Sequence, residues 1–215
     1  LHEQNLAEAL RVLGPDHPRT LVSRNNLASA YRSAGRLDEA IELHEQNLVD
    51  RERVLGPDHP RTLVSRNNLA GAYESAGRLD EAIELHEQNL VDRERVLGAD
   101  HPDTLASRNN LASVYRFAGR LNEAVPLYER TLADSERVLG PDHPDTLASR
   151  NNLATTCWSA GKLKRAIDLF ERNLAEAMRV LGPGHPNTRL SRKNLAAAYR
   201  AVGRDEDAAA LLDPP

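Results

Sequence analysis

Histidine is the residue type that first suggests chemistry in this chain. Eight histidines occur among its 215 residues, and a zinc site needs several N, S or O ligands within about 2 Å of one ion. His44-Glu45-Gln46-Asn47-Leu48 begins like the zinc-binding pattern His-Glu-x-x-His, but leucine stands in place of the second histidine. Five other histidines lie 42 residues apart, at His17, His59, His101, His143 and His185. Since this spacing puts them about one helix pair from each other, they cannot bind one ion together. We therefore expect no metal site and a structural role for each of them.

Two other candidates for chemistry lack the partners that catalysis requires. Cys157 occupies a position that is tyrosine in other repeats, as at Tyr31, and no histidine that could activate it lies nearby in the sequence. We therefore interpret it as a small buried residue. The pair Gly161-Lys162 is followed by Leu163 instead of serine or threonine, so it does not form a phosphate-binding loop. We predict no catalytic residue and no cofactor.

Composition and charge exclude several classes of protein. The chain is 40% hydrophobic and 28% charged, with a net charge of -4, and shows no long basic or apolar run. These values predict a folded protein that binds neither nucleic acid nor a membrane. A single cysteine fits a reducing compartment, and no targeting peptide is visible at the amino terminus, so we expect a cytoplasmic location.

Glycine marks an internal repeat of 42 residues, at Gly14, Gly56, Gly98, Gly140 and Gly182. We predict one array over residues 1–215, in which residues 1–13 form the second helix of a truncated repeat. Four full repeats then cover 14–55, 56–97, 98–139 and 140–181, and an incomplete repeat covers 182–215. Because the chain begins inside a repeat, we expect it to be part of a longer protein.

Each repeat is expected to contain two amphipathic helices. Apolar residues recur at helical spacing through both halves of residues 14–55. The first helix should begin at Pro18 with the Asp16 carboxylate as its cap, and should end near Gly35. The second should run from Leu37 to Gly56. In the last repeat the second helix should be short and stop at Asp213-Pro214-Pro215.

The fold class that follows is all-α. Antiparallel helix pairs should stack into a right-handed superhelical solenoid, because each pair buries only one face by itself. The first helices should line the concave side. The run Asp50-Arg51-Glu52-Arg53 on the second helix mixes both charges and is expected on a solvated convex side. His44 has Tyr128 and Phe170 at its equivalent positions, so it should be a packing residue.

The pattern Leu27-Ala28-x-x-Tyr31 with Gly35 and Ala40 resembles the tetratricopeptide repeat (TPR). It recurs from Leu69, Leu111, Leu153 and Leu195. The 42-residue spacing, the Asn-Asn-Leu-Ala core and the connector Leu-Gly-Pro-Asp-His-Pro resemble, more narrowly, kinesin light chains and bacterial signalling proteins. This resemblance implies a groove for an extended peptide or partner helix, lined by the first helix of each repeat.

Asparagine pairs are the first set of groove residues that the resemblance implies. An amide has donors and an acceptor, so a ladder of amides can bind a ligand backbone of any sequence. The alternative is that one asparagine of each pair bonds a neighbouring helix. The positions are Asn25, Asn26, Asn67, Asn68, Asn109, Asn110, Asn151, Asn152, Lys193 and Asn194.

Residues that differ between the repeats form the second set. Repeats 14–55 and 56–97 differ at two positions only, three residues apart on one helix face. We predict that this stripe sets specificity, with exposed Phe117 and Trp158 as binding anchors. The alternative is drift at tolerant exposed positions after duplication. The stripe comprises Ser29, Arg32, Gly71, Glu74, Ser113, Arg116, Phe117, Thr155, Trp158, Ala197 and Arg200.

The charge of the ligand depends on which arginines reach the groove. Arg32, Arg116 and Arg200 are balanced by Glu74 alone. If a further set also reaches the concave edge, the groove becomes basic and favours an acidic peptide. A clamp for a chaperone carboxylate tail fits poorly, because only Lys193 matches it. The further set is Arg24, Arg66, Arg108, Arg150 and Arg192.

We therefore predict a non-enzymatic scaffold that binds a protein or peptide in its groove. One alternative is the sensor or autoinhibitory arm of a larger signalling ATPase of the STAND type. Another is a module that self-associates end to end through its repeat ends.

Overall fold

The computed structural model describes residues 1–212, which contain eleven α helices and no strand. The predicted stop at residues 213–215 lies outside this range. The chain forms two compact units, unit 1 (Leu1–Val114) and unit 2 (Tyr115–Pro215), and their boundary falls within α6. The helices are α1 (His2–Leu13), α2 (Pro18–Ser33), α3 (Leu37–Leu55), α4 (Pro60–Ser75), α5 (Leu79–Leu97), α6 (Pro102–Phe117), α7 (Leu121–Val138), α8 (Pro144–Ser159), α9 (Leu163–Leu181), α10 (Pro186–Ala201) and α11 (Asp205–Leu212).

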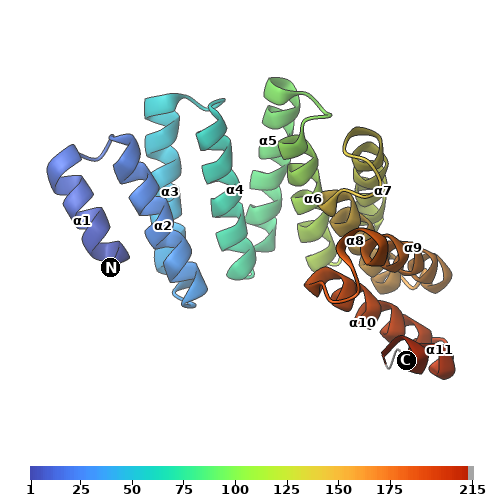
Figure 1. Ribbon diagram of the computed structural model, residues 1–215. Helices are drawn as coiled ribbons and strands as arrows, with labels where there is room; N and C mark the ends of the chain where they lie inside the picture. Colours follow the sequence, from blue (N-terminus) through green and yellow to red (C-terminus); the bar gives the residue numbers. More distant parts are fainter. Residues whose placement is uncertain (213–215) are drawn as a thin grey trace. The chain divides into compact units, whose positions relative to one another are not determined.

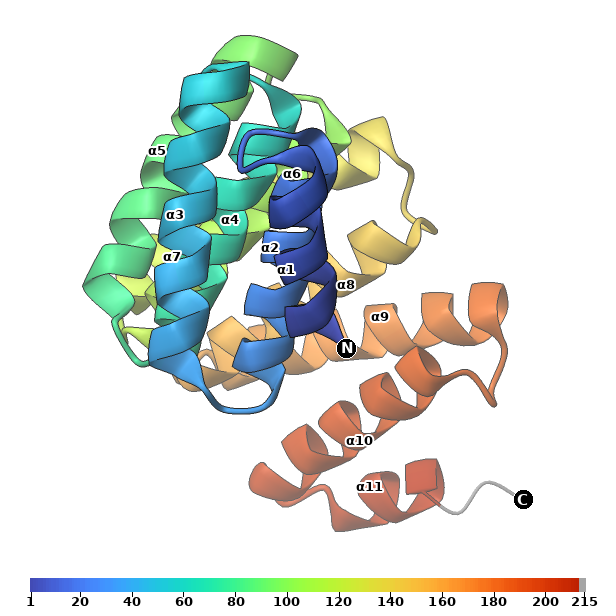
Figure 2. The same ribbon diagram turned by 90° about the vertical axis from the view of Figure 1, so that its left-hand side faces the viewer.

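Unit 1 is a row of antiparallel helices in which each helix from α1 to α5 packs on the next (Figure 1). In Figure 2, α3 and α5 lie to the left of α2 and α4. The core between them consists of small and branched residues such as Leu21, Ala28 and Ile41, which are at most 4% exposed. His44 is buried among them at 1% exposure, which confirms that its position is a packing site.

Unit 2 repeats the same arrangement from α7 to α11, and Figure 2 shows α9, α10 and α11 running alternately. Leu153, Phe170 and Ala196 are buried in its core. Cys157 is fully buried as expected, and burial raises the pKa of its thiol. The all-α class and the predicted helix pairs are confirmed by both units.

Glycine ends both helices of a repeat, as the sequence predicts. Gly35 follows α2 with a φ of 76°, and Arg36 N–H then donates to the Tyr31 carbonyl at 2.9 Å. This bond closes the last turn and directs the chain into α3. Gly56 ends α3 with a φ of 89°.

The predicted helix cap is wrong, because histidine caps the first helix and aspartate does not. His59 Nδ1 accepts the Arg61 N–H at 3.1 Å, ahead of Pro60 at the start of α4. The preceding aspartate instead accepts hydrogen bonds from an arginine at the end of the following second helix, as Asp58 does from Arg95. Those bonds hold the pKa of Asp58 below its usual range. Histidine caps in the same way at His17, His101, His143 and His185.

Removing one histidine cap should destabilise the fold measurably. We expect His59→Ala to lower the free energy of unfolding by about 1 kcal/mol, because one N–H at the start of α4 loses its acceptor. His59→Asn should retain most of the stability, since asparagine is a good cap. Urea titration followed by circular dichroism measures both variants. Equal losses for alanine and asparagine would contradict a capping role.

Candidate functional site

Asparagine amides connect the first helices of successive repeats. In unit 1, Asn68 Nδ2 donates to Asn25 Oδ1 at 2.8 Å, and Asn110 Nδ2 donates to Asn67 Oδ1 at 2.9 Å. In unit 2 the corresponding bond joins Asn194 to Asn151 at 3.0 Å. The second asparagine of one pair thus bonds the first of the preceding pair, so the alternative of bonding between helices is confirmed for these residues.

These bonds do not use the full capacity of the amides. A side-chain amide carries two N–H donors and two acceptor lone pairs, so a single hydrogen bond uses only part of its bonding capacity. Asn25, Asn67 and Asn151 are half-buried, and Asn26 is exposed. In the last repeat Lys193 replaces the first asparagine of the pair, and this lysine is exposed. A line of partly exposed amides therefore follows the first helices within each unit.

Exposed aliphatic side chains lie one turn before the asparagines, and the sequence interpretation missed them. Val22, Val64 and Leu190 are 41%, 43% and 51% exposed. Their spacing of three and four residues from the asparagines puts them on the same side of the helix. We call this surface the first-helix face: the positions of Val22, Asn25, Asn26 and Ser29 and their equivalents in the other repeats. The signal in the sequence that could have revealed these residues is an aliphatic side chain three or four positions before an asparagine, on the side of the helix that faces solvent.

The first two repeats differ at two positions, Ser29/Gly71 and Arg32/Glu74, and both positions affect packing inside the fold. A Cβ at Gly71 would lie 2.8 Å from Nη1 of Arg32, so glycine leaves room for that arginine. Glu74, which replaces arginine in the second repeat, contacts His86 Nε2 at 2.6 Å. In the first repeat, burial lowers the pKa of His44 to about 4, and the charges of Arg32 and Arg51 lower it further. These differences therefore change packing as well as surface.

The aromatic anchors differ from expectation. Phe117 is 59% exposed, and the Arg116 guanidinium lies 4.2 Å from its ring centroid. Trp158 is half-buried, whereas it was predicted to be exposed. Ser29, Gly71, Ser113 and Thr155 are half-buried, whereas Ala197 and Arg200 are exposed.

The prediction that a row of arginines makes the groove basic is wrong for four of its five members. Arg24, Arg66, Arg108 and Arg150 are 7%, 2%, 0% and 4% exposed. Each binds a carboxylate of a second helix, as the Arg24 guanidinium binds Asp50 at 2.5 Å. Their charge is neutralised inside the stack. The corresponding bonds join Arg108 to Glu94 and Arg150 to Glu136, while Arg192 is half-buried.

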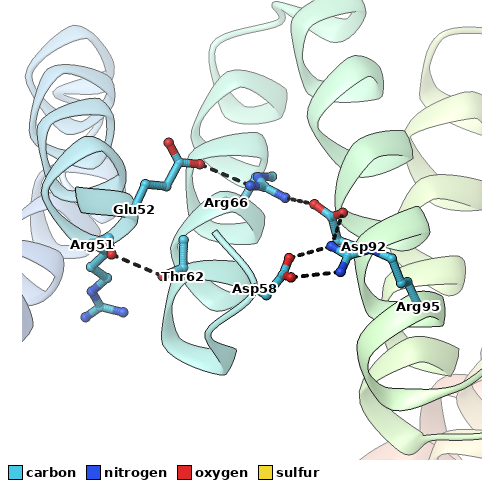
Figure 3. A network of polar contacts seen from close by, with 7 residues as sticks. All are labelled: Arg51, Glu52, Asp58, Thr62, Arg66, Asp92 and Arg95. Carbon is cyan, nitrogen blue, oxygen red and sulfur yellow. Dashed lines mark hydrogen bonds and ion pairs between the residues drawn. The ribbon is translucent and has the colours of Figure 1, made fainter. Parts of the chain in front are cut away.

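Figure 3 shows this network around Arg66, which binds Asp92 at 2.5 Å and Glu52 at 3.0 Å. The two carboxylates belong to α5 and α3, so one side chain of α4 joins both neighbours. Arg51 is also buried, at 5% exposure, and its Nη1 donates to the Arg61 carbonyl at 2.7 Å. The expectation that residues 50–53 form a solvated surface is therefore wrong for Arg51.

A cavity of about 220 Å³ opens on the first-helix face of unit 2, between α8, α9 and α10. It brings the predicted Asn151 and Asn152 together with apolar residues that the sequence interpretation missed. Phe117, Trp158 and Arg200 do not line it. Its lining is Leu147, Ala148, Asn151, Asn152, Asn173, Ala177, Asn187, Leu190 and Ser191.

Stacked antiparallel helix pairs with one recurring exposed face define an α-helical repeat protein. The chain belongs to the tetratricopeptide repeat family, whose model matches residues 1–48, 24–90, 67–136, 109–175 and 161–213. This fold is in general a protein-interaction scaffold, and the family is generally non-catalytic. Among residues 1–212, no helix is long and apolar enough to cross a membrane.

Solved structures point more narrowly to repeats of the kinesin light chain type. A Podospora anserina protein described as a kinesin light chain with nearly identical TPR-like repeats is 37% identical, with a TM-score of 0.79. The match covers 91% of this chain and 93% of that one. BtubC (BKLC) from P. vanneervenii shares the fold, with a TM-score of 0.83 at 24% identity over 99% of this chain and 85% of that one. No curated protein matches the sequence.

Proposed function

We propose that this chain is a scaffold that binds a peptide or partner helix along its first-helix face. The observation that carries the proposal is the line of asparagine amides, which bond each other once and retain donors and acceptors beside exposed aliphatic side chains. The amides suit the backbone of a ligand, and the aliphatic residues suit its apolar side chains. Cavities of this kind between helices are common ligand sites.

We expect the charge of the ligand to contribute less to its affinity than it would in a basic groove. Arg24, Arg66, Arg108 and Arg150 are paired inside the fold and offer no charge to a ligand. The basic residues that remain among the predicted groove positions are Arg32 in unit 1, where Glu74 opposes it, and Arg116, Lys193 and Arg200 in unit 2. We therefore propose that backbone and apolar contacts provide most of the affinity. The regulatory-arm and self-assembly alternatives stay predictions, which upstream sequence and light scattering would test.

Peptide selection followed by one isosteric substitution tests this proposal. Peptides selected from a displayed random library on the intact chain should bind Asn67→Asp about tenfold more weakly, because the variant loses its N–H donors. An aspartate oxygen can still accept the bond from Asn110, so the connection between α4 and α6 is kept.

The matched control is Asn122→Asp, which makes the same change at an exposed position near the start of α7. Fluorescence anisotropy should give the control the affinity of the unchanged chain. Equal affinities for both variants, or a library that yields no binding peptide, would contradict the proposed function.

A further inference from the structure

The cavity in unit 2 lies at a position where two other repeats carry a buried arginine. This phase of the second helix is Arg51 and Arg93 in those two repeats and a short residue in the others, at Ala9, Ser135 and Ala177. Ala177 is 1% exposed and lines the cavity. In unit 2 the space beside Ala177 is therefore left open by a short side chain.

The two arginines show what the position binds. Arg51 Nη1 donates to the Arg61 carbonyl, and Arg93 Nη1 donates to the Asp103 carbonyl, each at 2.7 Å. Both guanidinium groups are buried and reach the first turn of the next repeat's first helix. Burial lowers the pKa of both arginines.

The space at the two positions differs as this substitution predicts. Between α2, α3 and α4, where Arg51 is present, only about 10 Å³ remains, lined by Leu21, Arg51 and Arg61 among others. The matching residues of unit 2 are Leu147, Ala177 and Asn187, and there the cavity is about 220 Å³. Unit 2 has room for a long side chain that the protein itself does not supply.

The carbonyl acceptor of the buried arginines has a counterpart in the cavity. Asn173 Oδ1 has no hydrogen-bond partner, but neither does Asn47 Oδ1 beside Arg51, so that amide acceptor does not depend on the arginine. Asn187 corresponds to Arg61, whose carbonyl accepts the arginine in the first repeat, and Ala177 has no group to donate there. Apolar Leu147 and Leu190 also line the space and can contact a methylene stem.

We propose that this cavity binds an arginine side chain of the partner, which supplies from outside the guanidinium that Arg51 and Arg93 supply within the chain. The inference rests on the proposed function and names the side chain that anchors the ligand in unit 2. Arginine suits the site better than lysine, because a planar guanidinium presents several donors in a fixed geometry.

Capped pentapeptides test this inference directly. The probe is acetyl-Ala-Ala-Arg-Ala-Ala-amide, compared with the same peptide containing citrulline or norleucine, titrated into isotopically labelled intact chain. We expect chemical shift changes at Asn173 and Asn187 with arginine, and binding at least about tenfold weaker with either neutral residue. Equal binding of the three peptides would overturn the inference.

Ala177→Arg is the matched variant, because it restores the residue of the first two repeats. It should abolish binding of the arginine peptide and raise the melting temperature, since the cavity is filled. Ala177→Leu fills the cavity without a charge and should also abolish binding. Arg51→Ala should add an arginine site, which raises the stoichiometry by one peptide.

Two results separate this inference from the proposed function. If library-selected peptides bind the Ala177→Arg variant as tightly as the unchanged chain and contain no common arginine, the arginine site is wrong and the peptide-binding scaffold stands. If the arginine pentapeptide binds but no library peptide does, the cavity is a side-chain site and the extended groove is wrong.

Discussion

Replacing Arg66 by methionine is expected to lower the free energy of unfolding by about 3 kcal/mol. The guanidinium is 2% exposed and joins Asp92 and Glu52, which belong to two different helices. Without it, two carboxylates face each other across a site that is closed to most solvent. We place the value at the low end of the range for broken buried pairs, because Asp92 and Glu52 are themselves 19% and 39% exposed. Urea denaturation at pH 7 measures the loss.

Arg95→Met is the matched control for Arg66→Met, because Arg95 also binds Asp92, at 3.0 Å (Figure 3). Its side chain is 54% exposed, and solvent screens exposed ion pairs. We therefore expect a much smaller loss of stability from this variant. Equal losses for the two variants would show that burial of Arg66 contributes nothing to the stability of the stack.

His44→Phe should change how stability depends on pH. Burial lowers the pKa of His44 to about 4, with Arg32 of α2 and Arg51 of α3 acting in the same direction. In the unfolded chain the pKa of histidine is about 6.5. Between these values the unfolded chain binds the proton and the folded chain does not, so stability is lost as the pH falls from about 6.5 to 4. The loss from this residue is expected to be about 3 kcal/mol.

Phenylalanine already occupies this phase of the repeat at Phe170, so the variant should fold. Urea titrations at several pH values should show a flatter profile for His44→Phe than for the unchanged chain. His2 stands at the same phase in α1 but is exposed, and His2→Phe should leave the profile unchanged. An unchanged slope in His44→Phe would show that His44 does not cause the acid sensitivity.

The sequence predicted the helices and their phases closely, because each is a local consequence of glycine positions and of 3.6-residue periodicity. Gly35 and Gly56 end helices where expected, and His44 and Cys157 are buried where their phase places them. The asparagines also share a face because of their spacing alone. The aliphatic residues of that face were missed, since a valine in a helix is ordinarily assigned to the core.

Long-range pairing explains the errors. Arg24 and Arg53 look alike in a mixed-charge sequence, yet the first is buried and the second is exposed. Their partners lie 26 and 37 residues away, on other elements. A local pattern cannot assign such partners, so buried arginines were taken for groove residues. The connector aspartate was predicted to be a cap for the same reason, because the arginine that binds it lies 37 residues further along the chain.

The sequence by itself determined the family, the helix pairs and the phase of every side chain, since a 42-residue period gives each residue a fixed position in the repeat. The tertiary structure alone decided which charges are neutralised, which residue caps each first helix, and where a cavity opens. Those properties depend on distances between atoms of neighbouring helices. The short side chain of Ala177 leaves a cavity only because residues of three helices enclose the space beside it.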